Sequence, residues 1–146
     1  MRMRIALRIG NRAAVLAESN AELQIGFRKV HDQQAFLNAC LNHAPQAEVS
    51  KAAAKFEADP VAERDAEVLF QNAESLGFCG QADAALRELR KAIQGGYCSY
   101  PSMDKDPLFD TIQQRSEFAE LRQAAIQCQQ NFLAHRRQVD TSMARP

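Results

Sequence analysis

The chain has 146 residues, of which 46% are hydrophobic and 25% are charged, with no tryptophan and a formal net charge of zero. This composition favours one soluble helical domain over a disordered chain, and the balanced charge argues against a nucleic-acid partner. No apolar stretch approaches the roughly 18 residues that a membrane-spanning helix needs, so we expect an all-α protein without a membrane partner.

The first 30 residues carry two competing patterns. A heptad seam with a central asparagine would suit a coiled coil, and its members are Ile9, Ala13, Leu16, Asn20, Leu23, Phe27 and Val30. Against one long helix, Gly10 and Gly26 weaken helical structure, and Ser19 with Glu22 matches a capping box that begins a new helix. We expect two helices stacked on the rest of the protein, with a homo-oligomerisation module built on the 9–30 seam as the alternative.

Two helical hairpins are predicted next. Residues 66–94 contain two amphipathic faces separated by Gly77 and Gly80, and helices joined by so short a turn pack antiparallel. Residues 33–58 form a weaker copy, because "AFLNAC" at 35–40 falls on "LFQNAE" at 69–74 when it is shifted by 34 residues. A repeat of this length predicts a solenoid whose units bury their apolar faces against one another.

The second hairpin resembles a tetratricopeptide repeat, whose units are also helical hairpins of 34 residues. Asn72 departs from the family pattern, which usually has leucine there, and the first unit matches only at Ala39 and in its general spacing. The matching positions of the second unit are Leu69, Ala73, Leu76, Gly80, Ala85, Leu89 and Ala92. The resemblance implies a short solenoid of antiparallel helical hairpins that mediates protein–protein interaction.

The C-terminal part resembles the segment that closes tetratricopeptide arrays in bacterial multidomain proteins. Gly96-Tyr97, Asp106-Pro107 and Glu117-Phe118 carry this match. Such arrays often end signalling kinases, winged-helix regulators or cyclases, so a regulatory segment of a larger signalling enzyme or transcription regulator is a further alternative. The implied plan has four parts, which are an N-terminal helical segment (1–30), two hairpins (31–98), an array-closing turn, short helix and long capping helix (99–139), and a frayed tail (140–146).

The local physics of the closing segment agrees with this plan. Asp106 can cap a helix that has Pro107 at its first position. In "GGYCSYP" at 95–101, the two glycines suit a left-handed helix end. The face of the last helix that we expect to be buried consists of Phe118, Leu121, Ala125, Cys128 and Phe132.

The residues offer little chemistry beyond packing. Cys98 and Ser99 match no nucleophile motif, so we expect no catalysis. Cys40 and His43 make only half a zinc site, and we expect neither metal nor cofactor. The four scattered cysteines follow no secretory signal, so reduced, mostly buried thiols and a cytoplasmic location are expected.

The remaining functional surface is a groove lined by the first helix of each hairpin. The repeat register predicts that its lining consists of Phe36, Cys40 and His43 from the first unit and Phe70, Glu74 and Phe78 from the second. An aromatic groove with an acid would suit an apolar or basic peptide of unknown identity, or another part of the same chain. The alternative is that one of the chain's own helices fills the groove as core.

Overall fold

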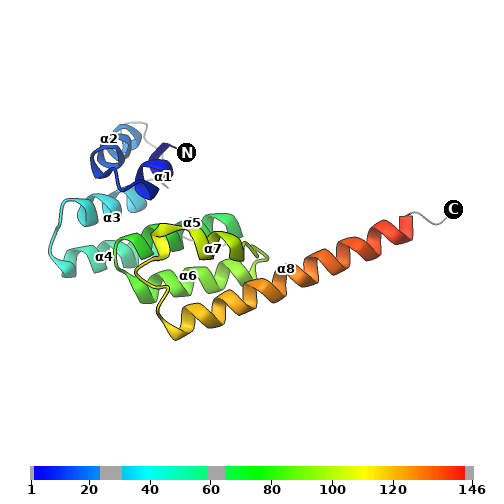
Figure 1. Ribbon diagram of the computed structural model, residues 1–146. Coiled ribbons are helices and arrows are strands. Elements are labelled where there is room, and N and C mark those ends of the chain that lie inside the picture. Colours follow the sequence, from blue (N-terminus) through cyan, green and yellow to red (C-terminus); the bar gives the residue numbers. More distant parts are fainter. Residues whose placement is uncertain (1, 24–30, 59–64, 144–146) are drawn as a thin grey trace.

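The computed structural model describes residues 2–23, 31–58 and 65–143, and within these ranges every regular element is helical, which confirms the all-α class. Figure 1 shows three successive hairpins followed by a short closing segment and a long helix that projects from the body. The elements are α1 (Arg2–Arg8), α2 (Arg12–Leu23), α3 (His31–Leu41), α4 (Gln46–Glu57), α5 (Ala66–Phe78), α6 (Ala82–Gln94), α7 (Tyr100–Lys105), the 3-10 turn η2 (Pro107–Phe109) and α8 (Ser116–Met143). A tetratricopeptide-like stacking of these hairpins stays a prediction.

Four helices end in the same backbone geometry. The second residue after the end of α1, α3, α5 and α6 is left-handed, with φ of 66° at Gly10, 55° at His43, 72° at Gly80 and 93° at Gly96. Each end has the paired backbone hydrogen bonds of a Schellman cap. Glycine adopts this conformation without a steric penalty, so His43 is the exception among the four.

The N-terminal segment forms two helices, but they divide at Gly10 and not at Ser19. α2 continues unbroken through residues 19–23, so the capping-box interpretation of Ser19 and Glu22 is wrong. The heptad seam is interrupted by the turn at Gly10, and its first member, Ile9, is 70% exposed. Three residues named for this segment lie outside the described ranges, namely Gly26, Phe27 and Val30.

The α5–α6 hairpin forms the centre of the core. Leu76 and Leu89 are fully buried, and the small side chains of Ala73 and Ala85, also inaccessible to solvent, let the two helices approach closely. The unusual Asn72 is buried as well, and its Nδ2 donates a hydrogen bond of 3.4 Å to Glu88 Oε2 on α6. The departure from the repeat pattern therefore supplies a polar partner for a buried carboxylate.

Gly77 marks the place where the closing segment presses on α5. A Cβ atom at Gly77 would lie 2.8 Å from the Leu108 carbonyl oxygen, and Thr111 Oγ1 donates to the Gly77 carbonyl at 2.6 Å. Asp106 caps η2, because its Oδ1 accepts from the Leu108 amide at 3.1 Å. The predicted cap is thus confirmed, although the element that it begins is a single 3-10 turn.

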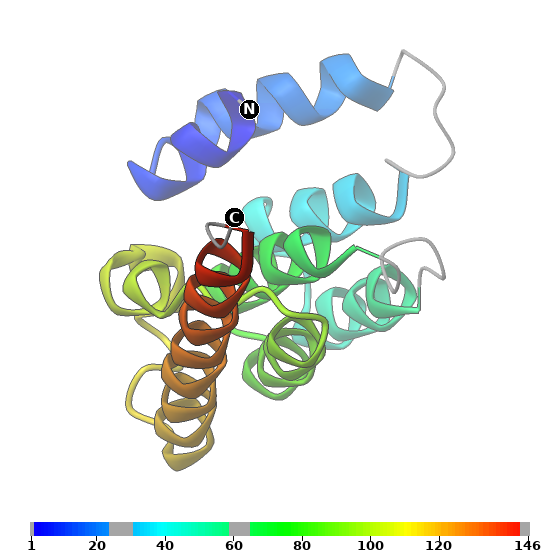
Figure 2. The same ribbon diagram turned by 90° about the vertical axis from the view of Figure 1, so that its right-hand side faces the viewer.

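The last helix is longer than expected, with 28 residues that end at Met143, so residues 140–143 belong to a helix and not to a frayed tail. Phe118, Leu121 and Ala125 are buried as predicted, but Phe132 is 61% exposed. The prediction fails at Phe132 because α6, against which α8 packs, has only 13 residues. The second half of α8 extends past the body in Figure 1, and in Figure 2 it points toward the viewer in front of the other helices.

Candidate functional site: the groove covered by α1

α1 brings one arginine against two buried carboxylates. Arg8 Nε donates to Asp106 Oδ2 at 2.8 Å, and a terminal nitrogen of the same guanidinium donates to Glu74 Oε1 at 2.9 Å. The Glu74 and Asp106 side chains are 1% and 4% exposed, whereas that of Arg8 is 41% exposed. The hydrogen bond to Asp106 raises the pKa of Arg8, which therefore stays charged. Because burial of an unpaired carboxylate is costly, Arg8 holds α1 in place.

α1 packs mainly on α2 and also contacts η2, and Arg8 reaches across to Glu74 of α5. We call the surface of α5 and η2 that Arg8 contacts the α1 groove, with Glu74 and Asp106 as its carboxylates. α1 buries Leu7 and Ala6, which are 2% and 6% exposed and belong to the same core cluster as α5 and η2. Two larger side chains of this segment point elsewhere, since Ile5 is 53% exposed and Ile9 is 70% exposed. α1 thus fits the α1 groove with only part of its apolar surface.

Three of the six residues that we predicted to line an open groove are core residues. Phe36, Phe70 and Glu74 have exposed fractions of 0%, 2% and 1%. Phe36 stacks on Phe56, and the ring of Phe70 lies 5.4 Å from that of Phe109, edge to face. The expected open groove is wrong at these positions, because Phe36 packs on α4, Phe70 on the closing segment, and Glu74 pairs with Arg8 of α1.

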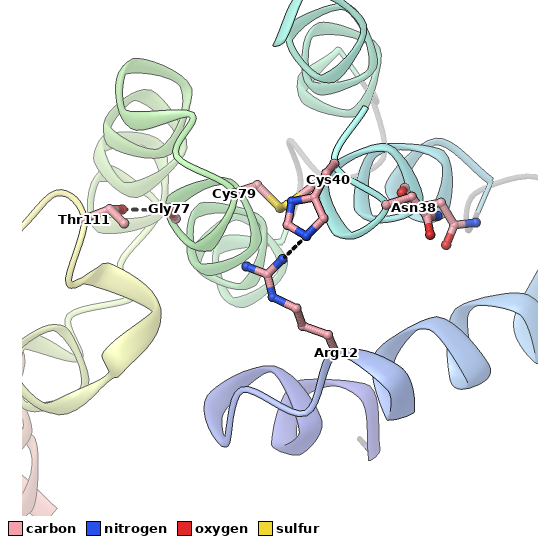
Figure 3. The surroundings of a disulfide bond; sticks show 8 residues. Arg12, Asn38, Cys40, Gly77, Cys79 and Thr111 are labelled. Carbon is pink, nitrogen blue, oxygen red and sulfur yellow. Dashed lines mark hydrogen bonds between the residues drawn. A yellow bond between two sulfur atoms is a disulfide. The ribbon is translucent and has the colours of Figure 1, made fainter. Parts of the chain in front are cut away.

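The other three predicted residues meet at a junction of three helix ends. His43 is exposed, while Cys40 and Phe78 are partly buried. Arg12, at the start of α2, lies 3.2 Å from His43 Nε2 and places its guanidinium 5.9 Å from the centre of the Phe78 ring. Arginine donates in the contact with His43, so Nε2 is the unprotonated nitrogen. Figure 3 shows Arg12 reaching from α2 toward the ends of α3 and α5.

Cys40 and Cys79 form a disulfide at this junction, with Cα atoms 5.8 Å apart (Figure 3). The expectation of reduced thiols is therefore wrong for this pair. The two cysteines are separated by 39 residues, and the bond ties the end of α3 to the end of α5. Their pairing also removes Cys40 as a candidate half of a zinc site.

Cys98 and Cys128 form a second disulfide, with Cα atoms 5.5 Å apart, so the expectation of reduced thiols is wrong here too. This bond ties the "GGYCSYP" turn to the middle of α8. Gly96 has the predicted left-handed conformation, whereas Gly95 has φ of −75°. Ser99 Oγ lies 2.8 Å from Ser102 Oγ. The stretch serves here as a helix end and a covalent anchor for α8.

A polar cavity of about 390 Å³ lies on the α4 and α6 side of the molecule. Arg87 pairs with Glu57 through two hydrogen bonds of 2.6 and 2.8 Å, and Arg115 lies 3.1 Å from Asp83. The positive charges that line the cavity are therefore balanced by carboxylates of the same wall, and the cavity has little net charge with which to attract a ligand.

Three residues of the site escaped prediction. Arg8 and Arg12 had no assigned role, and Asp106 was identified only as a helix cap. Arg8 is 66 residues from Glu74 and 98 from Asp106, so no local pattern could have paired them. The sequence feature that could have predicted this contact is the composition of α1, which combines apolar and basic side chains. Such a helix is the kind of ligand that we expected for an acidic, aromatic groove.

Within the described residues, no cluster of three or more potential metal-ligating side chains occurs, and no helix is long and apolar enough to cross a membrane. Comparisons with models of known protein families, with characterised proteins and with solved structures give no significant match. The tetratricopeptide resemblance therefore stays a prediction, and the function has to be inferred from the α1 groove itself.

Proposed function

We propose that this chain is a protein-interaction scaffold of tetratricopeptide-like hairpins that holds a helical segment in the α1 groove and performs no catalysis. One observation carries the proposal, which is that α1 already lies there in the manner of a ligand. It buries Leu7 and places Arg8 between the carboxylates of Glu74 and Asp106. Helix-in-groove recognition combines an apolar anchor with polar contacts in this way.

The two disulfides suit this role. They connect α3 to α5 and the turn after α6 to α8, so one of them restrains α5, a wall of the groove, and both restrain the helices beside it. A binding surface that is rigid before the ligand arrives loses less entropy on binding. The same bonds remove the support for a cytoplasmic location, because disulfides persist mainly in oxidising environments. Labelling of cell lysates with a thiol-reactive polymer should show four blocked cysteines.

Selection of ligands tests the proposal. We expect helical 12-residue peptides selected from a display library against the full-length chain to slow hydrogen exchange in α5 and η2 and to accelerate it in α1. The matched control is Arg115→Ala in the polar cavity, which should leave the affinity of these peptides unchanged. Peptides that lose affinity for the Arg115→Ala chain, or that leave the exchange of α5 and η2 unaltered, would contradict the proposal.

A further inference from the structure

The contact between Arg8 and its two carboxylates is chemically specific. A guanidinium offers several N–H donors in a fixed plane, and here two of its nitrogens reach carboxylates from different elements, Glu74 on α5 and Asp106 at the start of η2. The terminal nitrogen that pairs with Glu74 also lies against Asp106, so a lysine ammonium could reach both carboxylates, but it lacks the planar fork through which Nε and the terminal nitrogen donate together. The groove therefore favours an arginine over a lysine next to a buried apolar side chain, as Arg8 stands next to Leu7.

α1 is also a replaceable occupant of the groove. Both disulfides lie C-terminal to it, joining Cys40 to Cys79 and Cys98 to Cys128, so no covalent cross-link restrains α1. It has only seven residues, which is too short for an isolated helix to be stable in water. Ile5 and Ile9 stay exposed when α1 is docked, so they contribute little to its binding, and a helix with polar side chains at these positions would leave less apolar surface in water.

We propose that α1 is an intramolecular competitor, and that the α1 groove binds a basic amphipathic helix of a partner protein that presents a Leu-Arg pair in place of Leu7 and Arg8. This inference rests on the proposed function and names the partner's chemistry and the regulation of the same site. The partner must displace α1, so the unbound chain is autoinhibited.

The test uses full-length chains and a fluorescent peptide with the sequence of residues 1–12. Arg8→Glu places a negative charge beside Glu74 and Asp106 and should release α1. If α1 covers the groove in nine-tenths of molecules, its release raises the apparent affinity for the peptide about tenfold. Arg90→Glu is the matched control, since Arg90 is exposed on α6 and the charge change is the same. This control should bind the peptide as weakly as the unaltered chain does.

A second peptide tests the recognition of arginine. The 1–12 peptide carrying Arg8→Lys should bind the released chain at least several-fold more weakly, and the peptide carrying Arg8→Glu should not bind. Circular dichroism checks the folding of every chain. If Arg8→Glu does not fold, Arg8→Gln replaces it, with an affinity expected between those of the unaltered and fully released chains.

Three results would overturn the inference. If the unaltered and released chains bind the 1–12 peptide equally tightly, α1 does not compete with it. If the released chain binds the arginine and glutamate peptides equally tightly, Glu74 and Asp106 do not contribute to recognition of a basic ligand. A dimer of the unaltered chain that the 1–12 peptide converts to monomers would identify a second copy as the occupant. If the released chain binds library peptides that have no basic residue, only this inference fails. If it binds no helical peptide at all, the proposed function fails too.

Discussion

α1–α2 and α5–α6 are both hairpins of two consecutive helices, but different interactions hold them in the protein. α5–α6 buries leucines and alanines along both helices, contains the Asn72–Glu88 hydrogen bond, and is cross-linked to α3 through Cys79. α1–α2 contributes Leu7 and Val15 to the core and is tied to the body through Arg8 and Arg12. This contrast is the basis on which we propose α5–α6 as permanent core and α1 as a docked element.

Among the tests of this comparison, removal of the Cys40–Cys79 disulfide should change the stability of the protein most. A cross-link between residues 39 apart restricts the unfolded chain, and its loss in a Cys40→Ser/Cys79→Ser variant should cost about 4 kcal/mol of unfolding free energy. Denaturant titration measures the loss. Reductant should lower the stability of the unaltered chain, and if it has no effect, the disulfide does not stabilise the body.

A pair of leucine substitutions compares the two hairpins directly. Leu76→Ala removes a fully buried side chain from α5 and should lower the unfolding free energy by about 3 kcal/mol. Leu7→Ala removes a side chain that is just as inaccessible, but we expect it to accelerate hydrogen exchange in α1 with little change in the unfolding midpoint of the body. If both variants lower that midpoint equally, the two hairpins form one cooperative unit and the comparison is wrong.

His43→Gly sharpens the comparison at the junction where the two hairpins meet. The left-handed backbone at His43 is unfavourable for a residue with a Cβ, so glycine should stabilise the chain by about 0.5–1 kcal/mol. Arg12→Ala is the control that removes the hydrogen bond to His43 without changing the backbone. Gly80→Ala, at the equivalent end of α5, should destabilise by about 1 kcal/mol. Thermal unfolding of the three variants checks the signs.

The smallest expected effect is on the stability of the protein in acid, and it comes from Glu117 at the start of α8. Hydrogen bonds from Arg115, from its own backbone amide and from Ser116 lower the pKa of Glu117 from 4.5 to about 2. A lowered pKa in the folded state stabilises the protein above pH 4.5, and this contribution is lost as the pH falls from 4.5 to 2. Glu117 is at the surface, so the change should be slight. A Glu117→Gln variant should flatten the acid limb of the stability profile, and an unchanged slope would contradict the assignment.

Helices and turns were predictable from the sequence where the information was local. The spacing of Leu69, Ala73 and Leu76 defined the buried face of α5, and Gly80 and Gly96 marked helix ends because glycine favours a positive φ. The end of α3 was harder to locate, since a histidine takes the glycine position there.

The site was not predictable from local pattern, because it depends on residues far apart in the chain. Cys40 and Cys79 gave no hint of pairing until two hairpins were placed side by side. Similarly, Phe132 continues the apolar spacing of α8, and only the length of the neighbouring α6 shows that the buried face stops before it. The burial of Phe36, Phe70 and Glu74 fits the alternative in which the chain's own helices fill the groove, and Arg8 of α1 reaches Glu74 there.

The positions of the disulfides also determine what a protease could do to this protein. A single cut between residues 41 and 78, or between 99 and 127, would leave two pieces joined by a cystine. A cut in the turn at Gly10 would instead leave α1 without a covalent link to the body, held only by non-covalent contacts such as those of Leu7 and Arg8. Under the competition proposed above, limited proteolysis at this turn should expose the α1 groove irreversibly, while the cross-linked remainder stays intact.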